Sequence, residues 1–181
     1  HRRIRLHTEQ IKSHINARLS ARPERKEKAD LSLEKAMEGA KRIALANVLV
    51  RRLTVRYSAG ADRRGSGDIP LDPRIILPDW PSDEILALLE RPLFSEGGYG
   101  RVRIHHRSVM EYLAAQQIND QNEAGSMRVS AAKRLLFGLS SEGTLLPKPS
   151  MLAISGWLAN FRSDMFEMVL AVEPSISLIH G

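Results

Sequence analysis

The chain has 181 residues, of which 43% are hydrophobic and 27% are charged, so its composition excludes wholesale disorder and is typical of a globular protein. It contains no cysteine, which excludes disulfides, thiolate metal sites and a cysteine nucleophile. The net charge of +6 is uneven, because the basic surplus lies within residues 1–64. That surplus could neutralise nucleic-acid phosphates, or it could form a solvated helical face.

The first third of the chain is predicted to be mainly helical. Apolar residues recur in residues 2–20 at a spacing close to four, which indicates an amphipathic helix. Good helix formers dominate residues 31–53, and we expect a second helix there. Residues 53–57 alternate between apolar and polar side chains, which favours a short strand, and the glycine-bearing residues 60–68 favour a polar loop.

A helix and a β-hairpin are predicted next. Ser82 is a typical helix N-cap residue, and Pro92 marks the end of the helix that it begins. Residues 93–105 contain two β-prone segments around three glycines, which predicts a hairpin. Alternation in its second strand places basic side chains on one face, namely those of Arg101, Arg103 and His105.

Residues 102–115 have the pattern of a short strand that turns directly into a helix, with two histidines at the junction. From His106 to Ala115 the sequence follows the pattern H-x-S-x-x-E-Y-L-A-A. This pattern resembles the segment that closes the winged-helix domain of NACHT-type STAND NTPases, which are ATPase switches of signalling and defence. The order helix, hairpin, helix is what a winged-helix domain contains, with the hairpin as its wing.

The resemblance implies a role for His106. In these switches a winged-helix histidine contacts the β-phosphate of ADP and stabilises the closed state, and release of that contact permits oligomerisation. ADP or ATP, with Mg²⁺, then belongs to an NTPase domain of the same polypeptide, and we expect this chain to hold no cofactor or metal itself. The alternative role of His106 is that of a capping or core histidine that packs the corner between strand and helix.

The sequence itself offers no catalytic constellation. It lacks the Gly-x-x-x-x-Gly-Lys-Ser/Thr loop that surrounds phosphates in P-loop NTPases, so we expect that this chain is not an enzyme. Glu111 has no candidate catalytic partner and is expected to pair with Arg107 or Arg103. His105 and His106 are adjacent, so we expect them to point to different sides and not to share a metal ion.

Two other classes of function stay open. A winged helix can bind nucleic acid, and Arg101, Arg103 and Arg107 could contact phosphates. Against this alternative, the helix that would enter the major groove is mainly acidic, with Asp83 and Glu84 in its first turn. The chain could also be a passive helical scaffold.

The last third is predicted to be nearly all helical. Helices are expected over residues 127–139, 149–161 and 164–172, after a polar break at 120–125, and they are typical of the start of a HEAT-like or TPR-like repeat array. Trp157 and Phe161 are expected to lie in the core.

The expected fold is therefore mainly α. We expect a basic helical segment at 1–52, a winged-helix-like domain at 53–121 and a helical-repeat start at 122–181. Because no apolar run approaches the roughly 20 residues that span a bilayer, we expect no membrane partner and a cytoplasmic location. The chain begins with His1, and we expect it to be a fragment of a longer polypeptide.

Overall fold

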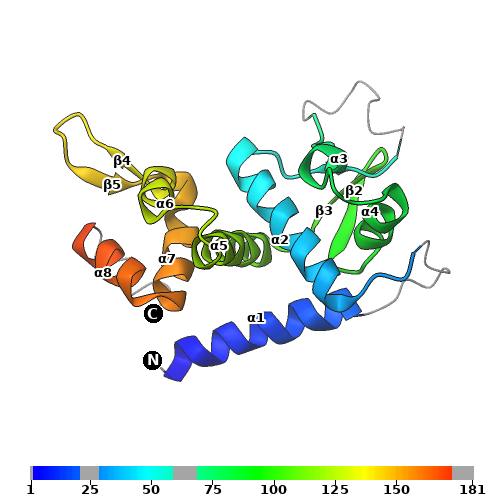
Figure 1. Ribbon diagram of the computed structural model, residues 1–181, viewed down its shortest axis with the longest axis horizontal. Coiled ribbons are helices and arrows are strands. Elements are labelled where there is room, and N and C mark those ends of the chain that lie inside the picture. Colours follow the sequence, from blue (N-terminus) through cyan, green and yellow to red (C-terminus); the bar gives the residue numbers. More distant parts are fainter. Residues whose placement is uncertain (1, 21–28, 59–68, 173–181) are drawn as a thin grey trace.

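The computed structural model describes residues 2–20, 29–58 and 69–172, and this part of the chain is mainly helical with a small antiparallel sheet (Figure 1). The N-terminal elements are α1 (Arg2–Ser20), α2 (Leu33–Val50), β1 (Val55–Arg56), α3 (Pro73–Ile76), α4 (Ser82–Leu89), β2 (Phe94–Gly98) and β3 (Arg101–Ile104). The C-terminal elements are α5 (Arg107–Glu123), α6 (Val129–Leu136), β4 (Phe137–Leu139), β5 (Leu145–Pro147), the short 3-10 turn η2 (Pro149–Met151), α7 (Leu152–Phe161) and α8 (Ser163–Val172). None of the described helices is both long enough and apolar enough to cross a bilayer.

Helix α5 lies at the centre of the molecule. In Figure 1 it is seen nearly end-on, with α2, α4, β2 and β3 on one side and α6, α7 and α8 on the other. It packs against both α2 and α7, and its residues Tyr112, Leu113, Ala114 and Ala115 are all buried. Four consecutive buried residues cover every face of a helix with 3.6 residues per turn, so α5 belongs to the interior.

The buried side chains form one continuous hydrophobic cluster. It includes Ile15 of α1, Ile43 of α2, Leu113 of α5 and Leu158 of α7. The packing therefore crosses both of the boundaries, near residues 52 and 121, at which the sequence predicts divisions between domains. The division into three parts remains a prediction, whereas the continuity of the core is an observation.

The three-stranded sheet has the order β1-β3-β2, and the hairpin predicted at 93–105 is present. Gly98 and Gly100 supply φ angles of +78° and +73° in its turn, a conformation that glycine adopts without a Cβ clash. The pairing of β2 with β3 is irregular between Glu96 and Gly98, and Arg101 of β3 pairs with Gly98 at this irregularity. This central strand therefore begins at a distorted hairpin end.

Of the two β3 arginines that the sequence offers as candidate phosphate contacts, Arg101 is not accessible. Its side chain is 4% exposed, whereas Arg103 is exposed. Arg101 is flanked by Arg56 of β1 on one side and Gly98 of β2 on the other. Arg103 pairs only with Ser95, because β1 has two residues and does not reach it.

The last third contains a β-hairpin that the sequence analysis missed. The predicted helix at 127–139 ends at Leu136, and Phe137–Leu139 pairs with Leu145–Pro147. The Ser140 hydroxyl accepts a hydrogen bond from the backbone N–H of Thr144, and Gly143 has a φ of +76°. A hydroxyl and a glycine at these positions are typical of a turn, so this part is not wholly helical.

Two further boundaries differ from the prediction. Helix α5 continues to Glu123 and so includes the first residues of the polar break expected at 120–125, and the chain leaves the helix at Ala124 and Gly125. Ser82 is the first residue of α4, and Pro81 occupies the N-cap position without a side-chain hydrogen bond. The loop expected at 60–68 lies outside the described residues.

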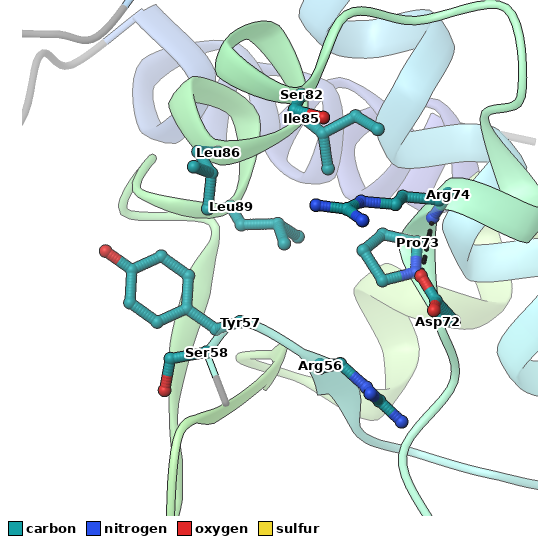
Figure 2. Close-up of a pocket in the computed structure, with 10 residues that line it drawn as sticks. All are labelled: Arg56, Tyr57, Ser58, Asp72, Pro73, Arg74, Ser82, Ile85, Leu86 and Leu89. Carbon is teal, nitrogen blue, oxygen red and sulfur yellow. Dashed lines mark hydrogen bonds between the residues drawn. The ribbon is translucent and has the colours of Figure 1, made fainter. Parts of the chain in front are cut away.

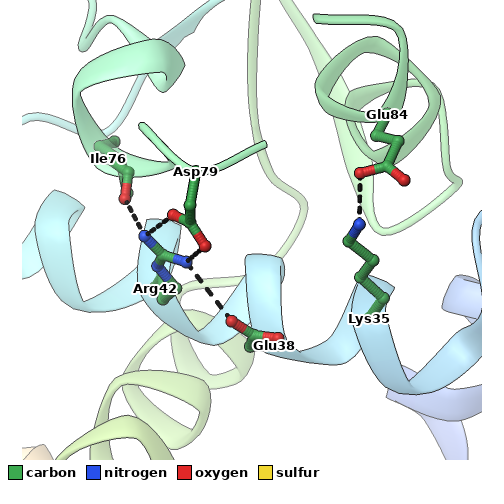
Figure 3. A network of polar contacts seen from close by, with 6 residues as sticks. All are labelled: Lys35, Glu38, Arg42, Ile76, Asp79 and Glu84. Carbon is green, nitrogen blue, oxygen red and sulfur yellow. Dashed lines mark hydrogen bonds and ion pairs between the residues drawn. The ribbon is translucent and has the colours of Figure 1, made fainter. Parts of the chain in front are cut away.

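Ion pairs attach α2 to the segment that contains α3 and α4 (Figure 3). Both terminal nitrogens of Arg42 donate to the Asp79 carboxylate, at 3.0 and 2.7 Å, and one also donates to the Ile76 carbonyl. The hydrogen bonds from Arg42 hold the pKa of Asp79 below its ordinary value. The Lys35 ammonium similarly pairs with Glu84 of α4. These contacts fix the helix that precedes the hairpin against α2.

Candidate functional site

His106 occupies the corner between β3 and α5. It is the N-cap residue of α5, with extended backbone angles of φ −123° and ψ 138°. Its side chain makes no capping hydrogen bond and is exposed. The imidazole therefore lies beside the free backbone N–H groups of a 17-residue helix, and such a helix end carries partial positive charge.

Three histidines gather at this corner, and we call His14, His105 and His106 the histidine corner. The rings of His105 and His106 lie edge to face with their centroids 4.2 Å apart, and His14 of α1 lies 6.0 Å from His106. The expectation that the adjacent histidines point to different sides is wrong, because the chain turns from strand to helix between them. Among the described residues no group of three or more His, Asp or Glu side chains is placed to hold a metal ion.

The charge around the histidine corner is positive. The pKa of His105 is below its ordinary value, first because of the neighbouring charge of His106 and then because of desolvation. Arg18, His14 and Arg103 lower it further. The guanidinium groups of Arg18 and Arg103 disfavour an additional proton on His105, and the same positive field favours an anion.

This depressed pKa predicts that protonation of His105 destabilises the fold. The ordinary histidine pKa is about 6.5, so below this pH the unfolded chain binds a proton before the folded chain does. Stability should therefore fall as the pH decreases below about 6.5, and the loss should be complete below the folded pKa of His105. We expect the melting temperature of His105→Asn to decrease less between pH 7.5 and 5.5 than that of the parent chain. An equal decrease in both proteins would contradict this assignment.

The structure separates the three arginines that the sequence singles out as candidate phosphate contacts. Arg101 is buried, and Arg103 is exposed with no ion-pair partner among the described residues. Arg107 is exposed, and its Nε lies 2.8 Å from the Glu111 carboxylate. This ion pair confirms the structural partner expected for Glu111. The exposed basic surface here is therefore smaller than three exposed and unpaired arginines would provide.

A cavity of about 390 Å³ opens beside the histidine corner, and we call it the basic cavity. Its polar lining consists of Asn47, Arg51, Arg103, His105, Arg107, Glu111 and Ser150. Its apolar lining consists of Val48, Leu53, Ile104 and Met110. The histidine corner and the basic cavity share His105, whereas His106 is not part of the cavity lining.

The contribution of α2 to the lining of this cavity was not predicted from the sequence. Asn47, Val48 and Arg51 come from the end of α2, about 50 residues before the strand and helix that complete the lining. No local motif marks them, because their role arises from the packing of α2 against α5. The sequence signal at 102–115 therefore identifies one wall of the cavity only.

A second cavity, of about 340 Å³, lies between β1, α3 and α4 (Figure 2). The Arg74 guanidinium extends into it beside Ile85 and Leu89, as Figure 2 shows. Among the described residues of the lining, Asp72 is the one carboxylate, and it accepts a hydrogen bond from the backbone N–H of Arg74 as the N-cap of α3. The described lining residues include no pair of groups suited to acid–base or nucleophilic chemistry.

Evidence for function thus comes from the geometry of the histidine corner and from the pattern that follows it. Comparisons of the chain with protein-family models, with curated proteins and with solved structures gave no match.

Proposed function

We propose that this chain is the regulatory, nucleotide-state-sensing part of a NACHT-type STAND NTPase switch that acts in signalling or defence. In this proposal residues 53–121 form a winged-helix-like domain, and the segment from residue 122 begins a helical-repeat region. His106 contacts the phosphate of ADP bound to an NTPase domain of the same polypeptide. A stimulus that separates His106 from the bound ADP ends the closed state and permits oligomerisation.

One observation carries the proposal: His106 is exposed at the N-terminus of the long helix α5, and its side chain makes no capping hydrogen bond to that helix. A histidine that merely capped the helix would use its side chain on the helix N–H groups, and this one makes no such bond. Helix N-termini favour phosphate, because their N–H groups and dipole attract anions. Arg18 and Arg103, which lower the pKa of His105, add positive charge nearby.

The nucleic-acid alternative has less support. Of the three candidate arginines, Arg101 is buried and Arg107 is paired with Glu111, which leaves Arg103 as the exposed side chain without an ion pair to a described residue. Phosphate-backbone binding draws on several basic contacts at once. A helical scaffold remains the other alternative, and it assigns no particular role to His106.

The experiment uses the polypeptide in which this chain follows a nucleotide-binding domain, purified with bound ADP. We expect His106→Ala to release ADP about 10-fold faster or more, which corresponds to the loss of one charge-assisted hydrogen bond. His105→Ala is the matched control and should leave ADP release nearly unchanged. A polypeptide without a P-loop domain, or equal release from both variants, would refute the proposal. Strongly salt-dependent DNA binding by the chain would favour the nucleic-acid alternative.

A further inference from the structure

We propose that the basic cavity is a binding site for a small phosphate monoester with an apolar body. The inference is independent of the nucleotide-sensing role, because His106 does not line the cavity. It rests on the charged side chains that line the cavity, on the backbone conformation of Arg51 and on the apolar part of the lining.

The cationic groups of the cavity match a phosphate dianion. Arg51 and Arg103 are exposed, and neither has an ion-pair partner among the described residues. A phosphate monoester carries about −1.5 to −2 charges at pH 7, so two guanidinium groups balance it. Guanidinium forks also match phosphate oxygens geometrically. The third arginine, Arg107, is oriented by its ion pair with Glu111.

Arg51 adopts a backbone conformation that glycine usually occupies at the end of a helix. It is the C-cap residue of α2, in the left-handed region with φ 56° and ψ 38°. Its backbone N–H donates to the Val48 carbonyl at 3.3 Å, and the next N–H, that of Arg52, donates to the Asn47 carbonyl at 3.1 Å. Glycine would close this turn without strain. The arginine therefore adds something that the turn does not need, namely a guanidinium at the edge of the cavity.

The rest of the lining suits the body of such a ligand. Val48, Leu53, Ile104 and Met110 provide an apolar wall. Asn47 is 1% exposed, and its Nδ2 donates to the Arg52 carbonyl. Its Oδ1 is buried without a hydrogen-bond partner in the described part of the chain. Buried acceptors without a donor are rare in folded proteins.

The test is calorimetric titration of the chain with phenyl phosphate and inorganic phosphate. We expect phenyl phosphate to bind more tightly than inorganic phosphate, because its ring buries apolar surface. In parallel, NMR titration should show the pKa of His105 rising when phenyl phosphate binds, because the added negative charge favours the imidazolium.

Two variants locate the site. Arg51→Gly keeps a residue suited to the left-handed conformation, and Arg103→Gln changes an exposed side chain, so both should retain the fold. Each should weaken phenyl phosphate binding about 10-fold, as loss of one charge-assisted hydrogen bond implies. The control is Lys133→Gln, which removes an exposed charge on α6 outside the basic cavity.

Three results would overturn the proposal. Absence of phenyl phosphate binding is the first, and binding no tighter than that of inorganic phosphate is the second. The third is an equal loss of affinity in Lys133→Gln, which would mean that only the overall charge matters. Failure here leaves the ADP-release experiment on His106 unaffected, so the two proposals are tested separately.

Discussion

Replacement of Tyr112 by alanine is expected to lower the free energy of unfolding by about 3–5 kcal/mol, the usual cost of deleting a fully buried aromatic ring. Tyr112 is 1% exposed on the central helix α5. Its ring meets Trp157 and Phe161 edge to face, at centroid distances of 5.2 and 5.5 Å. The substitution therefore leaves a cavity and also removes two favourable aromatic contacts. Urea denaturation measures the effect.

The matched control is Tyr112→Phe, which keeps the ring. The Tyr112 hydroxyl accepts a hydrogen bond from Gln116 Nε2 at 3.0 Å, so this variant should lose only about 1 kcal/mol. Burial of the phenol is the main cause that raises the pKa of Tyr112 to about 12. The unfolded chain therefore ionises first, near pH 10, and stability should fall above that pH in the parent but less in the Phe variant. If the alanine variant were as stable as the Phe variant, Tyr112 would not pack as described.

Arg91→Ala is expected to lower the free energy of unfolding by about 3 kcal/mol, because two buried hydrogen bonds from a charged donor are lost together. Arg91 is 4% exposed. Its terminal nitrogens donate to the Leu19 carbonyl at the end of α1, at 3.0 Å, and to the Leu31 carbonyl just before α2, at 2.9 Å. One planar guanidinium thus joins the ends of two helices that are separated in the sequence.

Hydrogen exchange distinguishes this role from a general loss of stability. We expect Arg91→Ala to increase amide exchange first in residues 11–20 of α1, since the Leu19 carbonyl loses its partner. Arg91→Lys should restore little, because one ammonium does not reproduce the guanidinium fork. The control is Arg128→Ala, at an exposed position before α6. Uniform exchange across the whole core in Arg91→Ala would contradict the local role.

Local sequence patterns predicted the order of elements well up to α5. The helices near 2–20, 31–53 and 82–92, the hairpin at 93–105 and the turn into a helix at His106 are all present, whereas the short helix α3 was not predicted. These elements are encoded by periodicity, glycines and prolines within a few residues. The hairpin at 137–147 was missed because Leu135, Leu136 and Phe137 continue an apolar run that equally fits a helix.

The site was predicted only where one local segment defines it. His106 follows from a pattern within ten residues, and the Arg107–Glu111 pair follows from helical spacing of four. Arg101 is buried although it alternates with the exposed Arg103 on the same strand, and the contribution of Arg51 depends on how α2 packs. His14 joins the corner through the placement of α1. Such relations arise from tertiary packing and carry no local signal.

The buried helix α5 has a mechanical consequence. Its 17 residues contain neither proline nor glycine, and it is about 25 Å long at 1.5 Å per residue, so it has no built-in hinge. One end begins at His106, and the other leads to α6. Because α2 and α7 both pack against it, α5 should move as a rigid rod. A push on its N-terminal end would then reach the far half of the molecule without any change in the helix itself.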